Sequence, residues 1–129
     1  IVVSGLDQDN ERKAIDIVMT KLRSLVEETG IGLILVSHLK RLQGDKSHED
    51  GATTSLSHLR GSAAIAQLSD CVLGLERDQQ SEDRNKTVLR VLKNRTSGIT
   101  GVAGELRYNT DTGRLVEGNA FDSEEEVMF

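Results

Sequence analysis

Apolar residues recur at steps of three and four along residues 9–29, a spacing that places them on one side of a helix. Asp9 or Asn10 can cap the start of this helix, and Gly30 can end it. The pattern therefore predicts an amphipathic helix with one apolar stripe, formed by Ile15, Val18, Leu22, Leu25 and Val26.

Residues 31–36, IGLILV, are almost continuously apolar rather than alternating. A short unbroken apolar run is typical of a strand that is buried on both faces, as in a parallel sheet. We therefore predict a buried strand here. A helix followed by such a strand is half of a βαβ unit.

The rest of the chain alternates between polar loops and short apolar segments. Residues 40–55 are rich in Gly, Ser, Thr and Asp, which predicts a long loop. Residues 56–69 predict a second helix, in which Gly61 is a candidate interruption. The remaining apolar segments predict strands at residues 71–77, 86–95, 102–109 and 114–117, with a hairpin between the last two.

This order of elements predicts an α/β fold. Its first half suits an open, mostly parallel sheet with helices on its faces, and its second half adds antiparallel strands that end in a C-terminal hairpin. Residues 1–118 form the predicted folded domain. Residues 119–129 contain Asp122 and three glutamates before the terminal Phe129, which predicts an acidic flexible tail.

Composition places the chain among soluble globular proteins. Its 129 residues are 36% hydrophobic and 29% charged. No apolar run approaches the roughly 18 residues that a membrane span requires, so we predict neither a membrane segment nor a secretory signal peptide. The chain opens with Ile1 in an apolar run, which suggests a piece of a longer fold. The single cysteine, Cys71, allows no internal disulfide and is predicted to be buried.

The net charge of −5 depends strongly on the tail, which holds four of the 21 acidic residues. Without the tail the chain is close to neutral, so the total does not exclude nucleic-acid binding, and local basic clusters must decide. Aromatic residues make up only 2% of the chain. A protein that binds bases mainly by aromatic stacking is therefore disfavoured.

Two cations, Lys93 and Arg95, follow the apolar part of the strand predicted at residues 86–95. If that strand continues to Arg95, both side chains point to the same side, since strand side chains repeat every two residues. The pair then predicts a site for an anion, such as a phosphate, supplied from outside the chain. An arginine suits the charge that spreads over a transferring phosphoryl group. The alternative is a solvated strand end.

His38 directly follows the predicted buried strand, and ligands of open α/β sheets bind beyond the carboxyl ends of strands. It is therefore a candidate to hydrogen-bond a phosphate, with a structural histidine as the alternative. The loop after it carries Lys40, Arg41 and Lys46. These cations can hold a nucleic-acid backbone through charge, although an ordinary solvated loop has a similar composition.

Arg77 and Tyr108 are candidates to hold a flat base between a guanidinium and a phenol ring. For Tyr108 the alternative is packing at the edge of the sheet. His38, His48 and His58 are ten residues apart and fit no zinc spacing, so no metal site is predicted. The chain also lacks the GxxxxGK[ST] phosphate loop.

Three long segments and the acidic tail together resemble a known family. The segments are HLKRLQGDKSHEDG, LSHLRGSAAIAQLSDCVLGLERDQQ and VLKNRTSGITGVAGELRYNTDTGRL. They resemble the C-terminal part of the helicase domain of bifunctional primase–helicases from short-tailed bacteriophages. Those proteins are ring-forming replicative helicases with a RecA-like core, and the mitochondrial Twinkle helicase is similar to them. The resemblance covers residues 1–118 closely and the tail in character.

The resemblance implies a role in nucleotide chemistry for several residues. Arg95 resembles the arginine finger that reaches the γ-phosphate bound by the adjacent subunit, and Lys93 would assist it. His38 resembles the phosphate-sensing histidine of the family. Arg77 and Tyr108 match positions that flank the base of the nucleotide.

The resemblance also implies a DNA-binding surface. The loop at residues 40–50 resembles the channel loop that holds single-stranded DNA, with Lys40 and Lys46 at its basic positions and Arg41 between them. Gln67 matches a glutamine near the DNA-facing elements. Residues 4–11 resemble another loop that faces the channel. At Ala66 such helicases can carry a basic residue, which is missing here.

The family resemblance implies partners and cofactors as well. ATP or dTTP with magnesium would be bound mainly by residues upstream of Ile1, so the chain alone is expected not to hydrolyse nucleotide. The chain would assemble as a ring, expected to be a hexamer, around single-stranded DNA in the cytoplasm of an infected bacterium. The acidic tail would contact the replicative DNA polymerase, or else be a solvated end.

Two other classes stay open at this stage. A RecA-like recombinase or a regulatory ATPase relative would share the sheet, the histidine and a channel loop, and would bind DNA or protein without unwinding. A stand-alone interaction domain with an acidic tail is the third class.

Overall fold

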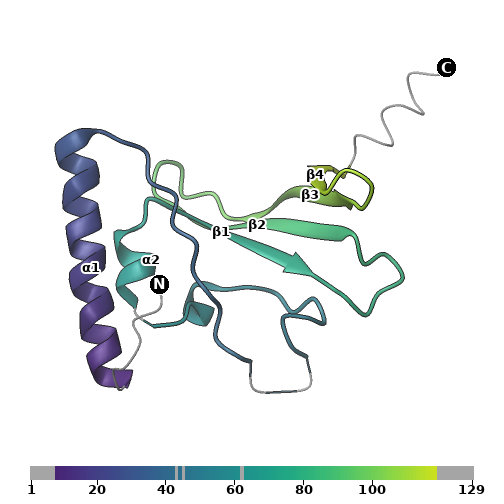
Figure 1. Ribbon diagram of the computed structural model, residues 1–129, viewed down its shortest axis with the longest axis horizontal. Helices are drawn as coiled ribbons and strands as arrows, with labels where there is room; N and C mark the ends of the chain where they lie inside the picture. The colour runs from purple at the N-terminus through teal and green to yellow at the C-terminus, as the bar shows by residue number, and fades with distance from the viewer. Residues whose placement is uncertain (1–7, 43, 45, 62, 119–129) are drawn as a thin grey trace. The chain divides into compact units, whose positions relative to one another are not determined.

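The computed structural model describes residues 8–42, 44, 46–61 and 63–118 (Figure 1). The chain divides into two compact units. The first unit joins Ile1–Lys40 to Leu56–Asp70, and the second joins Arg41–Ser55 to Cys71–Phe129. The predicted acidic tail at residues 119–129 lies outside the described residues. Residues 4–7 of the predicted channel-facing segment do so too.

Helix α1, Gln8–Thr29, confirms the first predicted helix (Figure 1). Of the predicted stripe, Ile15 is buried and Leu22 packs against the core of the first unit, whereas Leu25 is 43% exposed. Met19, which was not predicted, is buried in the same core with Ile65. Gly30 ends the helix at a φ of 69°, and its N–H donates to the carbonyl of Val26 at 2.9 Å. In the part of the chain that the structure describes, no helix is long and apolar enough to cross a bilayer.

The second predicted helix is divided in two. The 3₁₀ turn η1, Leu56–His58, is followed by the short helix α2, Ala63–Leu68. Gly61 lies between them with a φ of 106°, a backbone conformation that side-chain-bearing residues rarely adopt. A Cβ at Gly61 would lie 2.4 Å from Cδ1 of Ile15. The glycine therefore both breaks the helix and allows the close approach of α1.

The prediction of a buried strand at residues 31–36 is wrong. This segment forms no strand, and its side chains are largely exposed, with Ile34 at 95% and Val36 at 83%. Only Leu35 packs against the core of the first unit. A strand buried on both faces needs hydrogen-bonded neighbours, and within the described residues no strand pairs with this segment.

The second unit is built on a four-stranded sheet (Figure 1). Its strands are β1, Cys71–Arg77, β2, Lys86–Asn94, β3, Gly101–Asn109, and β4, Arg114–Glu117. They pair in chain order, and every pair is antiparallel. The α/β class, the four strands and the C-terminal hairpin are confirmed, but the mostly parallel sheet is wrong. The parallel part was expected to include the strand predicted at residues 31–36, and since that strand does not form, only the antiparallel strands are present among the described residues.

One face of this sheet is mainly apolar and partly exposed. Leu73 and Leu75 of β1 are 56% and 55% exposed, and Leu115 of β4 is 52% exposed. The prediction that Cys71 is buried is also wrong, since this first residue of β1 is exposed. As an outer strand, β1 has a neighbour on one side only, which leaves its end open to solvent.

Candidate functional site

A surface cavity of about 460 Å³ is lined by polar side chains from separate parts of the first unit. Lys40 and Gln67, both predicted to bind DNA, line it together with Arg12 of α1. Asp16, Gly61, Ala63 and Ala64 complete the lining. The sequence prediction missed Arg12, because its proximity to Gln67 depends on the packing of α1 against α2.

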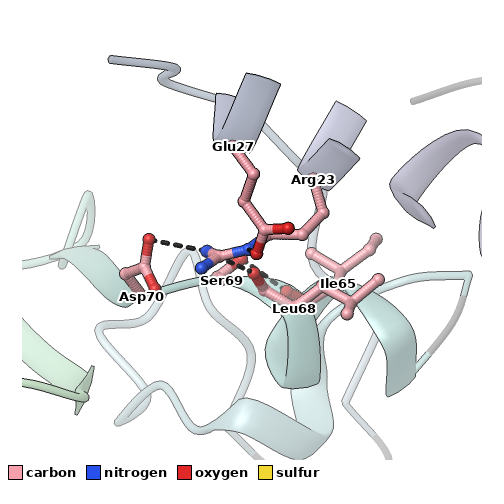
Figure 2. A network of polar contacts seen from close by, with 6 residues as sticks. All are labelled: Arg23, Glu27, Ile65, Leu68, Ser69 and Asp70. Atoms are coloured by element: carbon pink, nitrogen blue, oxygen red, sulfur yellow. Dashed lines mark hydrogen bonds and ion pairs between the residues drawn. The ribbon is translucent and has the colours of Figure 1, made fainter. Parts of the chain in front are cut away.

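The end of α2, which carries Gln67, is held by Arg23 of α1 (Figure 2). The Arg23 guanidinium donates to the carboxylates of Glu27 at 2.9 Å and Asp70 at 2.8 Å. It also lies 3.5 Å from the carbonyl oxygen of Leu68, the last residue of α2. The hydrogen bonds to Glu27 and then Asp70 raise the pKa of Arg23. A cation at the C-terminal carbonyls of a helix is favourable, so this contact stabilises the wall of the cavity.

The backbone before Lys40 runs antiparallel to residues 58–60. Leu39 forms an isolated bridge with Leu59, and the N–H of Lys40 donates to the carbonyl of His58 at 2.6 Å. The carbonyl of His38 accepts from the N–H of Arg60 at 3.0 Å, and the His38 side chain is exposed. His38 therefore does not follow a strand, contrary to the prediction, but lies in a short two-stranded bridge that fixes Lys40 at the cavity.

The predicted DNA loop belongs mostly to the second unit, where Arg41 and Lys46 are exposed. Its second half contacts the residues that directly follow β1. The carbonyl of Glu49 accepts from the N–H of Gln79 at 2.9 Å, and Asp50 forms a bridge with Asp78. The loop is therefore anchored along residues 49–54, directly after Lys46.

A buried carboxylate makes the third attachment of this loop. Glu76 of β1 is 7% exposed, and its Oε1 accepts from the N–H and Oγ1 of Thr54 at 2.7 and 2.9 Å. Arg90 of β2 donates to the same carboxylate from Nε at 2.7 Å and Nη2 at 3.3 Å. Burial opposes ionisation of Glu76, but the hydrogen bonds from Arg90 and Thr54 outweigh it and lower its pKa. The sequence analysis did not single out this network.

Arg95 lies outside the strand that was predicted to include it. β2 ends at Asn94, whose Oδ1 accepts from the N–H groups of Thr96 and Ser97 at 3.2 and 3.3 Å. The N–H of Gly98 donates to the carbonyl of Asn94 at 2.8 Å, which closes the turn. The alternation argument that paired Lys93 with Arg95 therefore does not apply. Arg95 is exposed on a hydrogen-bonded turn, and Lys93 is half-buried beside Val72.

The strand register places Arg77 and Tyr108 on one face of the sheet. Arg77 pairs with Thr87, Thr87 pairs with Leu106, and Tyr108 is two residues beyond Leu106 on the same face. β2 lies between their strands, and Tyr108 is offset by two residues from the position across from Arg77. Arg77 donates from Nε to the carbonyl of Arg84, and Tyr108 is 39% exposed. The two side chains share a face of the sheet but do not lie directly across from each other.

The structure thus divides the predicted site residues between the two units. His38, Lys40 and Gln67 belong to the first unit. The second unit contains Arg41, Lys46, Arg77, Lys93, Arg95 and Tyr108.

The sequence of this chain has no GxxxxGK[ST] phosphate loop, and the described residues contain no cluster of three or more His, Cys, Asp or Glu side chains that could hold a metal ion. Its basic and aromatic side chains suit a base or a phosphate, but the donor set does not fit magnesium.

Residues 2–117 match the DnaB-like helicase C-terminal domain. The chain belongs to this family. It is also 46% identical, over 115 residues, to the DNA helicase/primase of Enterobacteria phage T3. This alignment covers 89% of the chain but 20% of that relative, so the chain spans about one fifth of the relative's length. The resemblance to phage primase–helicases is confirmed. The cavity lined by Lys40 and the turn that carries Arg95 are therefore parts of a DnaB-like domain.

Proposed function

We propose that this chain is the C-terminal part of a ring-shaped replicative DNA helicase of the phage primase–helicase type. The complete protein would use nucleotide hydrolysis to move along single-stranded DNA and separate the duplex, in the cytoplasm of an infected bacterium. The family match and the 46% identity to a DNA helicase/primase support this class. Ring assembly, expected to be a hexamer, and the DNA substrate are parts of the proposal.

The observation that carries the DNA-binding part is the cavity shared by Arg12, Lys40 and Gln67. Two cations and an amide suit a phosphodiester, because cations neutralise the phosphate and the amide adds a hydrogen bond. The carboxylate of Asp16 also lines the cavity, but the lining keeps an excess of positive charge. Such contacts read no base sequence, as a moving helicase requires. Arg41 and Lys46 on the anchored loop would hold neighbouring phosphates.

The second part of the proposal concerns Arg95, which would stabilise the γ-phosphate of ATP or dTTP bound by the neighbouring subunit. Its exposed position on a hydrogen-bonded turn suits a guanidinium that acts on another molecule. Lys93 would assist, His38 would sense the phosphate, and Arg77 and Tyr108 would flank the base. Magnesium and the phosphate cradle would come from residues outside this chain.

Replacement of Arg95 by alanine tests this role in the complete helicase. Because the charge of the transferring phosphoryl group would lose its partner, DNA-stimulated nucleotide hydrolysis should fall by about 10³-fold or more, while single-stranded DNA binding changes little. The matched control is Arg114→Ala, which removes another exposed arginine of the same unit. Hydrolysis at the wild-type rate in the Arg95 variant would rule out the role.

A mixing experiment separates action on a neighbour from action within one subunit. Arg95→Ala subunits are combined with subunits whose own phosphate-binding lysine is replaced. If Arg95 acts across the interface, some mixed interfaces contain an intact site, and hydrolysis should recover to well above either variant alone. No recovery would contradict the trans arrangement.

Duplex separation distinguishes a helicase from a relative that only binds DNA. The complete protein should unwind a forked duplex in the presence of ATP or dTTP. If it binds the fork and hydrolyses nucleotide without unwinding, the chain belongs to a recombinase-like or regulatory protein instead.

A further inference from the structure

We propose that Glu76 is a positioning residue for DNA binding: with Arg90 it holds residues 46–55 of the loop in the shape in which Lys46 contacts single-stranded DNA. This inference rests on the proposed function, because it assigns a role to the support of the loop rather than to the loop itself.

The first argument is the cost of burying Glu76. An ionised carboxylate at 7% exposure loses most of its hydration, and the loss is offset only when hydrogen bonds replace water. Here one carboxylate accepts two bonds from Thr54 and two from Arg90. An apolar pair of similar size would often give equal or greater stability, so the ionic network is better explained by the geometry that it imposes.

The second argument is the direction of the bonds from Thr54. Both its backbone N–H and its hydroxyl donate to the same oxygen of Glu76, so the backbone and the side chain are fixed together. Thr54 is itself only 3% exposed. Thr54 lies near the end of the loop, so its contact with Glu76 fixes the C-terminal end of the segment that carries the cations.

The third argument is the space that the sheet leaves for Thr54. A Cβ at Gly74 would lie 2.2 Å from Oγ1 of Thr54, so only glycine allows the contact. Gly74 pairs with Arg90 in the strand register, and Glu76 is two residues further along β1 on the same face. One contact surface on the sheet for Thr54 is thus formed by Gly74, Glu76 and Arg90.

The loop is therefore held before any ligand arrives. Its attachments at Glu49, Asp50 and Thr54 begin three residues after Lys46. A flexible loop would have to be ordered when DNA binds, which lowers affinity, whereas an anchored loop avoids part of that loss. Arg90 also pairs with Glu76, so the support adds no net negative charge to the unit that carries these cations.

The test compares Glu76→Gln with Glu105→Gln in the complete helicase. Both variants change a glutamate to its amide in the same sheet, but Glu105 pairs with Lys86 at 2.8 Å and the structure describes no bond from it to the loop. Glu76→Gln should weaken single-stranded DNA binding about tenfold, because an amide cannot accept the same set of bonds and presents an N–H donor to Arg90. Glu105→Gln should bind as wild type.

Two further readouts distinguish positioning from a general loss of structure. Nucleotide hydrolysis without DNA and ring assembly should be unchanged in Glu76→Gln. Hydrogen exchange should increase at residues 46–54 and stay at the wild-type level in β2 and β3. A second variant, Thr54→Val, removes only the hydroxyl donor, so it tests the idea even if Glu76→Gln folds poorly. Thr54→Val should weaken DNA binding less than Glu76→Gln does. The double variant should bind DNA no more weakly than Glu76→Gln alone.

Lys46→Ala separates failure of this inference from failure of the proposed function. If Lys46→Ala weakens DNA binding while Glu76→Gln and Thr54→Val bind as Glu105→Gln does, the positioning role is overturned and the DNA-binding loop stands. If Lys46→Ala and Lys40→Ala both leave binding unchanged, the proposed DNA-binding surface itself is wrong.

Discussion

At the scale of single residues, Arg12 is a side chain that only the folded chain identifies as part of a binding surface. In the sequence it is one cation in the polar run Asn10 to Lys13. Packing of α1 against α2 places it at the cavity with Lys40 and Gln67, whose roles were predicted from the family resemblance. Residues that belong to a motif can be predicted individually, whereas a residue recruited by a tertiary contact cannot.

Arg12→Ala should weaken single-stranded DNA binding equally for all base sequences, because a phosphate contact carries no sequence information. Loss of one such contact should reduce the slope of log affinity against log salt by about 0.7. The complete helicase is titrated with single strands at several salt concentrations, and Lys13→Ala, which removes the adjacent exposed cation outside the cavity lining, is the control. An unchanged slope in Arg12→Ala would remove this residue from the DNA surface.

Glu76 was missed for a related reason. In the sequence CVLGLER it reads as one polar position near the end of an apolar strand, which usually faces solvent. Its burial depends on Thr54 and Arg90, which are far from it in the chain. No local pattern encodes which polar residue of a strand will be covered by a loop.

At the scale of elements, the predictions succeeded where the signal is local. The 3.6-residue repeat of α1 and the bounded apolar segments of β1 to β4 identified these elements to within about two residues at their ends. The segment at residues 31–36 failed because strand formation depends on a neighbour that supplies hydrogen bonds. The antiparallel direction of the later strands was predicted, and it agrees with connections of four to eight residues, which cannot join parallel strands.

The break between η1 and α2 gives a test at this scale. Gly61→Ala should destabilise α2, because the new Cβ would meet the buried Ile15 and the φ of 106° disfavours any side chain. The expected cost is about 1–3 kcal/mol. Hydrogen exchange of the α2 amides in the complete helicase measures it, and Gly32→Ala, with nothing within 4 Å, should leave them unchanged. Equal protection in both variants would show that Gly61 is not required.

At the scale of the whole molecule, the two units of this chain carry different parts of the proposed machine. The first unit holds the cavity with Lys40 and Gln67, and the second holds the anchored loop and the turn with Arg95. The family could be predicted from combined motifs, because their spacing is specific as a set. The sequence has no phosphate loop, and the described residues hold no metal cluster, which is why the proposed function assigns the phosphate cradle and magnesium to residues outside this chain.

The acidic tail supplies a prediction at this largest scale. Removal of residues 119–129 from the complete helicase should lower its affinity for the replicative DNA polymerase at low salt, because attraction between exposed charges is strongest there. The difference should disappear as the salt concentration rises. Neutralising only the four acids, with Val127 to Phe129 kept, separates charge from apolar contact. Unchanged affinity at low salt would leave the tail as a solvated end.

The close approach of Thr54 to Gly74 limits which residues relatives of this chain can carry at these two positions. A relative with alanine at the position of Gly74 must also place a smaller residue, such as glycine, at the position of Thr54, or lose the close approach of loop and strand. Replacement of Gly74 should therefore occur together with a change at position 54, twenty residues earlier, whereas Thr54 can become smaller while Gly74 is kept.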